Sequence, residues 1–301
     1  MTDRRPYPSD LSDARWALVE PTLTAWRQAR TERALAFGRP PEHDLRHLLD
    51  AILYVDRTGI PWRYLPHDYP PQQTVYAYFA RWQKEGLFEQ PGGLLRRLVR
   101  AAEGRAPEPT ACILDSQSVK TSTNVPAADQ GIDAAKKTVG RKRSIVTDTI
   151  GLPLAVLVTA ASVQDSIAGQ QLLTHVSAEH PGIRKAWADM GHKNAVIEHA
   201  ATLGIDVDIV RRDPATRGFA VQPRRWVVER TLGRLMNNRR LARDYEALPA
   251  RSEAMVHVAM ISLMTRRLTG ETTPIWRGTC TSGPGTKRPV RATIRQRSTC
   301  S

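Results

Sequence analysis

The sequence contains only 3 cysteines in 301 residues, and their positions exclude two classes of small-scaffold protein. Cys112, Cys280 and Cys300 lie far apart, without a CxxC pair or a Cys/His spacing typical of metal ligands. A disulfide framework or a zinc site needs more closely spaced ligands, so neither is expected. Cys112 lies in a short apolar run and is predicted to be a buried strand residue.

Long apolar runs are also missing. The sequence has no run of about 18 apolar residues, which is the length a membrane-spanning helix needs. The N-terminal residues lack the apolar centre of a signal peptide. Neither membrane insertion nor secretion is indicated, and a cytoplasmic, nucleoid-associated protein is expected.

Acidic residues are in deficit. The chain has 30 Asp and Glu against 44 Lys and Arg, which gives a formal net charge of +14. Such an excess of positive charge favours a polyanionic partner, above all nucleic acid. The alternative is a basic surface in contact with water alone.

Residues 1–105 are predicted to form a small all-α, helix-turn-helix-like domain. Ser12 is a candidate cap of a first helix, which Pro21 would bend or end. Apolar residues between positions 45 and 52 follow the i, i+3, i+4, i+7 spacing of one buried helix face, and Gly59 is a natural stop. The Pro-rich residues 106–109 are expected to link this domain to the next.

A helix that begins near Gln73 is the candidate DNA-reading element. Its spacing predicts an inward face of Val75, Tyr78, Phe79 and Trp82 and an outward face of Thr74, Tyr76, Ala77 and Arg81. This arrangement suits the recognition helix of a helix-turn-helix, and it places Thr74, Tyr76 and Arg81 at the DNA. Any small helical bundle would give the same stripe, so both interpretations stand.

Beyond the linker, residues 108–270 are predicted to form an α/β domain with a mixed sheet flanked by helices. Strands are expected at 111–114, 145–148, 154–159, 183–189 and 205–210, with helices at 164–176, 192–203 and from 225 to about 268. Residues 122–143 are expected to form a mobile basic loop, in which Lys142 and Arg143 are candidates for DNA contact. The tail, 271–301, is basic and is predicted to be disordered.

Three acidic residues of this domain are candidates for one site. Asp115 and Asp189 follow apolar runs that are predicted to be strands, and Glu229 opens a basic helix, so the three carboxylates could converge at one sheet edge. Three such carboxylates repel one another without a cation, which favours a two-metal nuclease. Taken singly, each acid has a structural alternative, as a turn or cap residue or, for Glu229, as a partner of Arg225. Asp148 is better explained as a turn cap, and Asp165 as a helix cap.

Several motifs resemble those of bacterial insertion-sequence transposases of the DDE class, in the IS-four/IS-five branch. The resemblance extends from Leu11 to Leu268. Its carriers are Asp56-Arg57-Thr58-Gly59-Ile60-Pro61-Trp62-Arg63, Val75-Tyr76-Ala77-Tyr78-Phe79-Ala80-Arg81-Trp82, Leu114-Asp115-Ser116-Gln117-Ser118-Val119-Lys120, Gly140-Arg141-Lys142-Arg143 and Arg224-Arg225-Trp226-Val227-Val228-Glu229-Arg230-Thr231.

The resemblance implies a helical DNA-binding domain before a ribonuclease-H-like catalytic domain. Asp115, Asp189 and Glu229 match the family's metal-binding triad. It therefore implies an enzyme that uses two Mg²⁺ ions, for which Mn²⁺ substitutes, to cleave the ends of its element and transfer DNA strands. Double-stranded DNA is the expected partner, and pairing two ends implies a homo-oligomer.

The family's third motif, Tyr-x2-Arg-x3-Glu-x6-Lys, matches Arg225 and Glu229 only. Gln222 stands at its Tyr position and Met236 at its Lys position. Arg225 is one helical turn from Glu229 and is a candidate phosphate ligand. Arg239 and Arg240 are candidates to replace the missing cation, although a basic face in contact with water explains them equally well.

Other positions depart from the family pattern as well. Ser144 stands where His is usual, and His192 stands where Tyr is usual. These departures, with the tail, leave two alternatives: a decayed transposase that retains DNA binding only, and a ribonuclease-H-like nuclease that cleaves without strand transfer. The tail extends past the resemblance, and a frameshift or fusion is one explanation.

Overall fold

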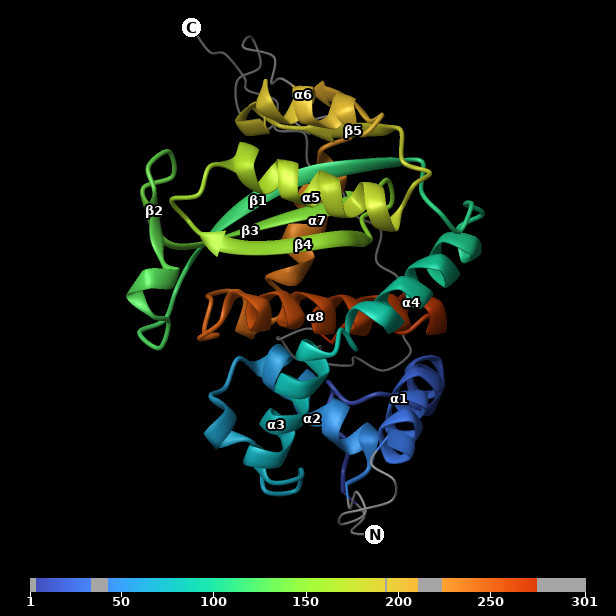
Figure 1. Cartoon of the computed structure of the whole chain (residues 1–301). Helices are drawn as coiled ribbons and strands as arrows, with labels where there is room; N and C mark the ends of the chain where they lie inside the picture. Colours follow the sequence, from blue (N-terminus) through green and yellow to red (C-terminus); the bar gives the residue numbers. More distant parts are fainter. Residues whose placement is uncertain (1–3, 34–42, 193, 211–223, 275–301) are drawn as a thin grey trace, which may run out of the picture.

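The computed structural model describes residues 4–33, 43–192, 194–210 and 224–274. Helices α5 and α6 cover one face of a mixed sheet, α7 and α8 pack on the other, and the long α8 separates the sheet from the N-terminal helices (Figure 1). The α-helices are α1 (Asp13–Arg33), α2 (Leu45–Thr58), α3 (Gln72–Lys84), α4 (Glu89–Ala102), α5 (Asp165–Glu179), α6 (Ala195–Thr202), α7 (Trp226–Leu235) and α8 (Pro249–Thr269). The strands are β1 (Ala111–Lys120), β2 (Gly131–Asp133), β3 (Thr138–Asp148), β4 (Pro153–Ala160), β5 (Lys185–Ala188) and β6 (Asp206–Ile209).

The sheet combines an antiparallel half and a parallel half. Strand β3 runs antiparallel to β1, β2 and β4, whereas β5 lies parallel to β1 on its other side and β6 parallel to β5. The parallel strands are joined through helices, as parallel connections require. The expectation of a ribonuclease-H-like mixed sheet that follows an all-helical region is confirmed.

Side chains of β1 alternate between the two faces of the sheet. Cys112 and Leu114 pack in the apolar cluster that includes α5 and α6. Ile113 packs in the other cluster, with residues of α7, α8 and the N-terminal helices. Because strand side chains alternate with a period of two, Asp115 shares the face of Ile113 and points toward α7. Cys112 is a buried strand residue as predicted, and burial raises the pKa of its thiol to about 12.

Local sequence signals fix the ends of α2. The side chain of Asp44 accepts a hydrogen bond from the backbone nitrogen of Arg46 and caps the first turn. Gly59 ends the helix with a φ of 74°, and a Cβ there would lie 2.9 Å from the Cβ of Arg239. Glycine is therefore required at this stop for both its conformation and its size. The connection from α2 to α3 spans residues 59–71, longer than the turn of three to four residues in a helix-turn-helix.

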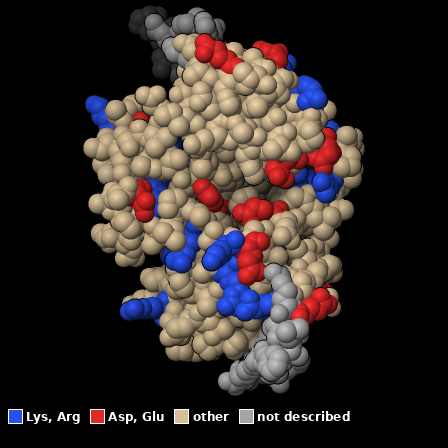
Figure 2. Space-filling model, in the orientation of Figure 1, with Lys and Arg blue, Asp and Glu red and all other residues tan. Residues whose placement is uncertain are grey.

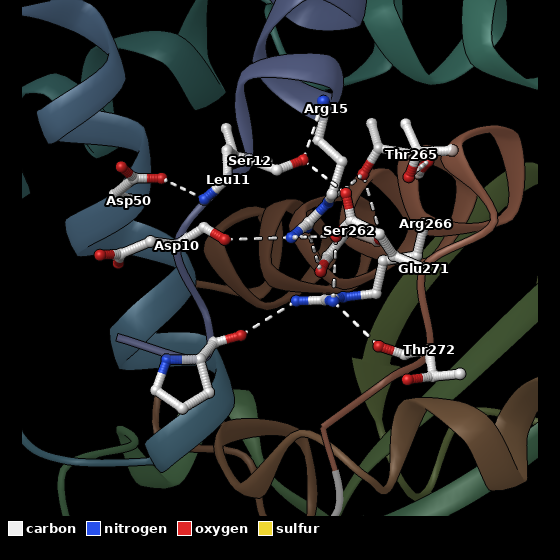
Figure 3. A network of polar contacts seen from close by, with 12 residues as sticks. Asp10, Leu11, Ser12, Arg15, Asp50, Ser262, Thr265, Arg266, Glu271 and Thr272 are labelled. Atoms are coloured by element: carbon white, nitrogen blue, oxygen red, sulfur yellow. Dashed lines mark hydrogen bonds and ion pairs between the residues drawn. The ribbon is translucent and has the colours of Figure 1, made fainter. Parts of the chain in front are cut away.

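A polar network ties the N-terminal segment to α8 (Figure 3). The guanidinium of Arg15 donates to Thr265 and Ser262 of α8 and to the carbonyl of Asp10. Arg266, in turn, donates to the carbonyl of Pro8. The last described helix thus packs into the N-terminal bundle, and the first turn of α1 depends on residues about 250 positions later in the chain.

Two expectations about the elements need correction. Of the two outcomes predicted for Pro21, a bend or an end of the helix, the end is wrong, because Pro21 lies inside α1, which continues to Arg33. Strand β3 begins at Thr138, so the basic residues 140–143 belong to a strand and not to a mobile loop. The described part of the chain contains no helix that is both long and apolar enough to cross a bilayer. Residues 275–301 of the tail lie outside the described residues.

Candidate active site

Asp115 and Asp189 lie on neighbouring strands at the parallel part of the sheet. In the β1–β5 ladder, Ile113 is paired with Trp187. Continuing this register by two residues places Asp189, the residue after β5, beside Asp115. The side chain of Asp115 is 8% exposed and that of Asp189 is 30% exposed, so one carboxylate is enclosed and the other is open to solvent.

Glu229 approaches these acids from α7. It lies in the first turn of this helix, which packs on the face of β1 that carries Asp115. A guanidinium nitrogen of Arg225 lies 3.4 Å from Asp115 Oδ2 and 3.4 Å from Glu229 Oε1. One arginine thus bridges two of the three candidate acids, and its positive charge also acts on Asp189.

The two aspartates differ in their electrostatic environment. Burial raises the pKa of Asp115, and the charges of Asp189 and Glu229 add to this effect, while Arg225 opposes it. Burial also opposes ionisation of Asp189, but the hydrogen bond and charge of His192 outweigh it and lower the pKa of Asp189. The enclosed acid therefore holds a proton more tightly than the open one.

Two groups fix the orientation of Asp189. Its Oδ1 atom accepts a hydrogen bond from Gly191 N at 3.0 Å and lies 2.7 Å from His192 Nδ1. The imidazole of His192 is 1% exposed, and within the described residues its Nε2 atom has no hydrogen-bond partner. From the sequence, His192 was noted only as a departure from Tyr. Its position three residues after Asp189 was the signal that could have predicted its contact with that carboxylate.

A fourth carboxylate lies beside the site. Asp165 Oδ1 accepts from Ser116 Oγ at 2.9 Å and pairs with Lys142 Nζ at 3.0 Å. Asp165 is the first residue of α5, and its carboxylate binds Ser116 and Lys142 instead of capping the helix. The expectation that Asp165 is a helix cap is wrong. Asp148, in contrast, accepts hydrogen bonds from Ile150 N and Leu152 N and stabilises its turn as expected.

Lys142 and Arg143 are buried in β3, with 5% and 2% of their surfaces exposed, so they lie in a strand and not on the predicted loop. Lys142 Nζ donates to the carbonyl of Val163, and Arg143 donates to that of Leu241. Burial lowers the pKa of Arg143, while nearby acids oppose the shift. Oxygen atoms of the protein, from backbone carbonyls and from Asp165, thus accept the hydrogen bonds and ion pairs of these two cations.

Arg240 is likewise enclosed. Its guanidinium pairs with Glu246 at 2.7 Å and donates to the carbonyl of Ile60, the second residue after α2. Its neighbour Arg239 is exposed. On the visible face of the molecule, basic side chains gather below the sheet layer, toward the N-terminal helices (Figure 2).

The outward face predicted for α3 is only partly correct. Arg81 is exposed and Thr74 is half-buried. Tyr76 turns inward: its ring lies 5.3 Å from that of Trp62, and its hydroxyl accepts a hydrogen bond from Arg251 of α8. The prediction of Tyr76 as an outward residue is therefore wrong, because aromatic packing and α8 occupy its face.

Divalent cations fit the donor set of the site. Two aspartates and a glutamate offer oxygen ligands of the type that Mg²⁺ prefers. Within the described ranges, however, no group of three His, Cys, Asp or Glu side chains lies close enough to enclose a metal ion. Arg225 supplies the positive charge between Asp115 and Glu229 instead.

Two family models match the chain. Residues 11–91 match the model described as "Putative transposase of IS4/5 family", and residues 106–264 match that of the transposase DDE domain. No curated protein matches the sequence. The second model covers more than half of the chain, and its boundaries enclose β1 to α7 and most of α8. The chain therefore belongs to the transposases with a DDE domain, of the IS4/IS5 type.

Proposed function

We propose that this transposase binds the terminal inverted repeats of its insertion sequence, cleaves the DNA at these ends and joins the 3′-hydroxyls to target DNA. Asp115, Asp189 and Glu229 are its divalent-metal ligands. The observation that carries this proposal is that Arg225 bridges Asp115 and Glu229, while Asp189 follows the strand paired with that of Asp115.

Each acid has a distinct structural support. Asp115 is held by β1 and accepts from Ser116 N at 2.8 Å, while Asp189 is oriented by Gly191 and His192. Glu229 is 39% exposed and can change rotamer without disturbing the core. When bound, Mg²⁺ or Mn²⁺ ions lower the barrier to phosphodiester displacement by stabilising the attacking and leaving oxygens.

Arg225 has two roles in this proposal. Without a cation it holds Asp115 and Glu229 together by opposing their mutual repulsion. With divalent cations on the same carboxylates, Arg225 would be free to leave them and to bind a DNA phosphate. A planar guanidinium suits both partners, since carboxylate and phosphate present similar pairs of oxygens.

DNA contacts outside the acids are assigned to the exposed Arg81 on α3 and the exposed Arg239. The half-buried Thr74 on α3 is a further candidate. A homo-oligomer is part of the proposal, because two element ends have to be cut and joined together. Lys142, Arg143, Arg240 and Tyr76 are left out, because their polar groups already bind protein atoms.

The test uses the full chain and duplexes taken from the DNA on either side of its own reading frame. Asp115→Asn, Asp189→Asn and Glu229→Gln should each reduce Mg²⁺- or Mn²⁺-dependent nicking by roughly 10³-fold or more, since metal catalysis contributes several kcal/mol. Asp206→Asn removes an exposed carboxylate of β6 and is the matched control with unchanged nicking. Nicking that persists in all three variants would refute the assignment.

The same experiment separates the alternatives. Binding of the flanking DNA without cleavage in any divalent cation would favour a decayed transposase. Of the departures behind that reading, Ser144 is buried with its hydroxyl unpartnered among the described residues, Met236 ends α7, and Gln222 lies outside them. Cleavage without joining of the 3′-ends to a second duplex would favour a nuclease.

A further inference from the structure

A basic cavity lies between the catalytic layer and the N-terminal bundle, away from the three acids. Its volume is about 310 Å³, and α2, α7, α8 and the segment after α8 form its walls. In Figure 1, α7 runs from the sheet toward α8, so this helix carries Glu229 near one end and reaches the cavity with the other. The charged lining residues are Asp56, Arg57, Arg230, Arg234, Arg266, Arg267 and Glu271.

Positive charge dominates this lining. Five arginines face two carboxylates, a higher ratio than the 44 to 30 of the whole chain. Arg266 is occupied, because it binds the carbonyls of Pro8 and Thr272 and pairs with Glu271. Arg57 donates to the carbonyls of Asn237 and Pro274. The fold itself therefore accounts for two of the five arginines.

The other three are only partly satisfied by the fold: Arg267 pairs with Glu103 at 2.8 Å, and Arg230 donates to the carbonyl of Ile150 at 3.3 Å. Among the described residues, Arg230 Nε and Arg267 Nη1 are buried without a hydrogen-bond partner. Burial and the charges of Arg230 and Arg267 lower the pKa of Arg234, and no described acid offsets these effects. Like charges are thus held together at a cost to folding, which is the arrangement expected where an anion binds.

We propose that this cavity binds the phosphodiester backbone of the DNA strand next to the cleaved bond, with Arg230, Arg234 and Arg267 as its phosphate ligands. The inference rests on the proposed function, because it names where the DNA runs after it leaves the acids. Arg230 and Arg234 are one helical turn apart and share a face of α7.

Helix geometry sets the distance from the acids. Arg234 is five residues beyond Glu229, which is about 7.5 Å along the helix axis. Successive nucleotides of one strand rise about 3.4 Å in a duplex, so this step corresponds to roughly two nucleotides. Arg57 and Pro8 in the same wall bring this strand to the N-terminal bundle as well. One cavity thus connects the site of cleavage with the helices proposed to bind the element end.

The first test measures how DNA affinity depends on salt. The probe is a labelled duplex of the flanking DNA, and all chains carry Asp115→Asn so that the DNA stays intact. The logarithm of the binding constant falls linearly with the logarithm of the salt concentration, and each lost phosphate contact makes this slope less steep by about 0.9. Arg234→Gln should therefore reduce the steepness by about one, and Arg230→Gln combined with Arg234→Gln by about two. Arg30→Gln removes an exposed arginine of α1 and should leave the slope unchanged.

Two further measurements exclude a merely structural effect. The melting temperature of the Arg234→Gln chain should equal or exceed that of the parent, since the change removes repulsion. Arg234→Lys keeps the charge and should keep the slope. A slope no lower than that of Arg30→Gln, or a melting temperature that falls together with the affinity, would overturn the proposal.

A second experiment locates the contact. Single phosphates of the duplex are replaced by neutral methylphosphonates, one position at a time. Arg234→Gln should be coupled to one or two neighbouring positions and additive with all others, as expected for a direct contact. Coupling at no position would overturn the proposal. Inorganic pyrophosphate could instead stabilise the parent chain against thermal unfolding. Loss of this stabilisation in Arg234→Gln, without a change in the salt slope, would also overturn the proposal, because it identifies a small-anion site.

Failure of the cavity proposal and failure of the proposed enzymatic function give different experimental results. Cleavage that requires Asp115, together with an unchanged salt slope in Arg234→Gln, retains the enzyme and rejects the cavity. A lowered slope in a chain that never cleaves retains the cavity as a DNA contact and rejects the enzyme.

Discussion

Two sets of arginines in this transposase have opposite relations to the fold. The first set, Arg141 and Arg143 in β3, is fully enclosed, and its guanidinium groups donate to backbone carbonyls of the segment before α8. The second set, Arg230 and Arg234 in α7, is half-exposed, and neither arginine forms an ion pair with an acid of the described residues. Arg230 donates only to the carbonyl of Ile150, while Arg143 in the first set leaves its Nε alone without a partner among the described residues. We expect the oxygens and acids that the fold supplies, rather than the charge of a motif, to decide which set binds DNA.

The difference is also energetic. Arg141 pairs with Asp244 at 3.5 Å, and the carbonyls of Glu246 and Ala247 accept its other hydrogen bonds. A buried charge with this many partners costs little to keep and much to remove, because its partners would stay behind unpaired. Arg234 has neighbours of its own sign, so its removal leaves no acid unpaired. Substitutions in the two sets should therefore separate stability from DNA binding.

The largest effect is expected for Arg141→Met. The change leaves Asp244 buried without its cation, and it should lower the free energy of unfolding by about 3–5 kcal/mol, measured by urea denaturation. Arg97→Met is the matched control: Arg97 is 57% exposed, its pair with Glu108 lies on the surface, and the loss should be about 0–1 kcal/mol. At temperatures where the chain is folded, the salt slope of DNA binding should not change. A lowered slope would place Arg141 in the second set.

A buried acid with too few partners tests the same rule through pH. Asp50 accepts a hydrogen bond from Leu11 N (Figure 3). The nearest nitrogen of Arg4 is 3.9 Å from the Asp50 carboxylate. Burial raises its pKa from 3.8 to about 7. A raised folded-state pKa contributes stability that is complete below pH 3.8 and is lost as the pH rises through about 7.

The substitution Asp50→Asn should remove this pH dependence. The asparagine oxygen can still accept from Leu11 N and carries no charge to bury. Relative to the parent, the variant should gain about 2–4 kcal/mol at pH 8 and almost nothing at pH 4, measured by denaturation at both values. Asp206→Asn, on the exposed β6 edge, should change neither value. Equal gains at both pH values would show that Asp50 is ionised and satisfied in the fold.

The fold and the neighbouring positions of Asp115 and Asp189 on paired strands could be predicted because local patterns determine them. Apolar runs before Asp115 and Asp189 predicted two strands, and parallel strands bring their carboxyl ends together. The stop at Gly59 was predicted for the same reason, since a left-handed conformation is a local requirement. The periodicity of apolar residues and the positions of helix-ending residues are enough to predict such features.

The fate of the basic residues could not be predicted in this way. The sequence 140–143 has the charge of a DNA-binding loop, and only the β1 register shows that it is a central strand. The partners of Arg143 and Arg240, at Leu241 and Glu246, come from a segment about 100 residues after β3 or from the turn after Arg240 itself. Tyr76 likewise bonds Arg251 of α8, 175 positions away. Tertiary partners of this kind leave no local signal.

The smallest effect, and the test of the N-terminal bundle, concerns Arg81 on α3. Thr74, Ala77 and Arg81 are three and four residues apart and form one face, while Tyr76 lies on the side that packs on Trp62. If this face meets phosphates, Arg81→Gln should weaken binding of the flanking DNA by about two- to fivefold and lower the salt slope by about one.

The matched control for Arg81 is again Arg30→Gln on α1, and both chains should melt at the parent temperature because both arginines are exposed. An Arg81→Gln slope equal to that of the control would remove α3 from the DNA. Residues 59–71 would then have a structural role, because they place Trp62 against Tyr76, which binds α8. The N-terminal bundle would contribute to DNA binding only through the arginine cavity at its junction with α7.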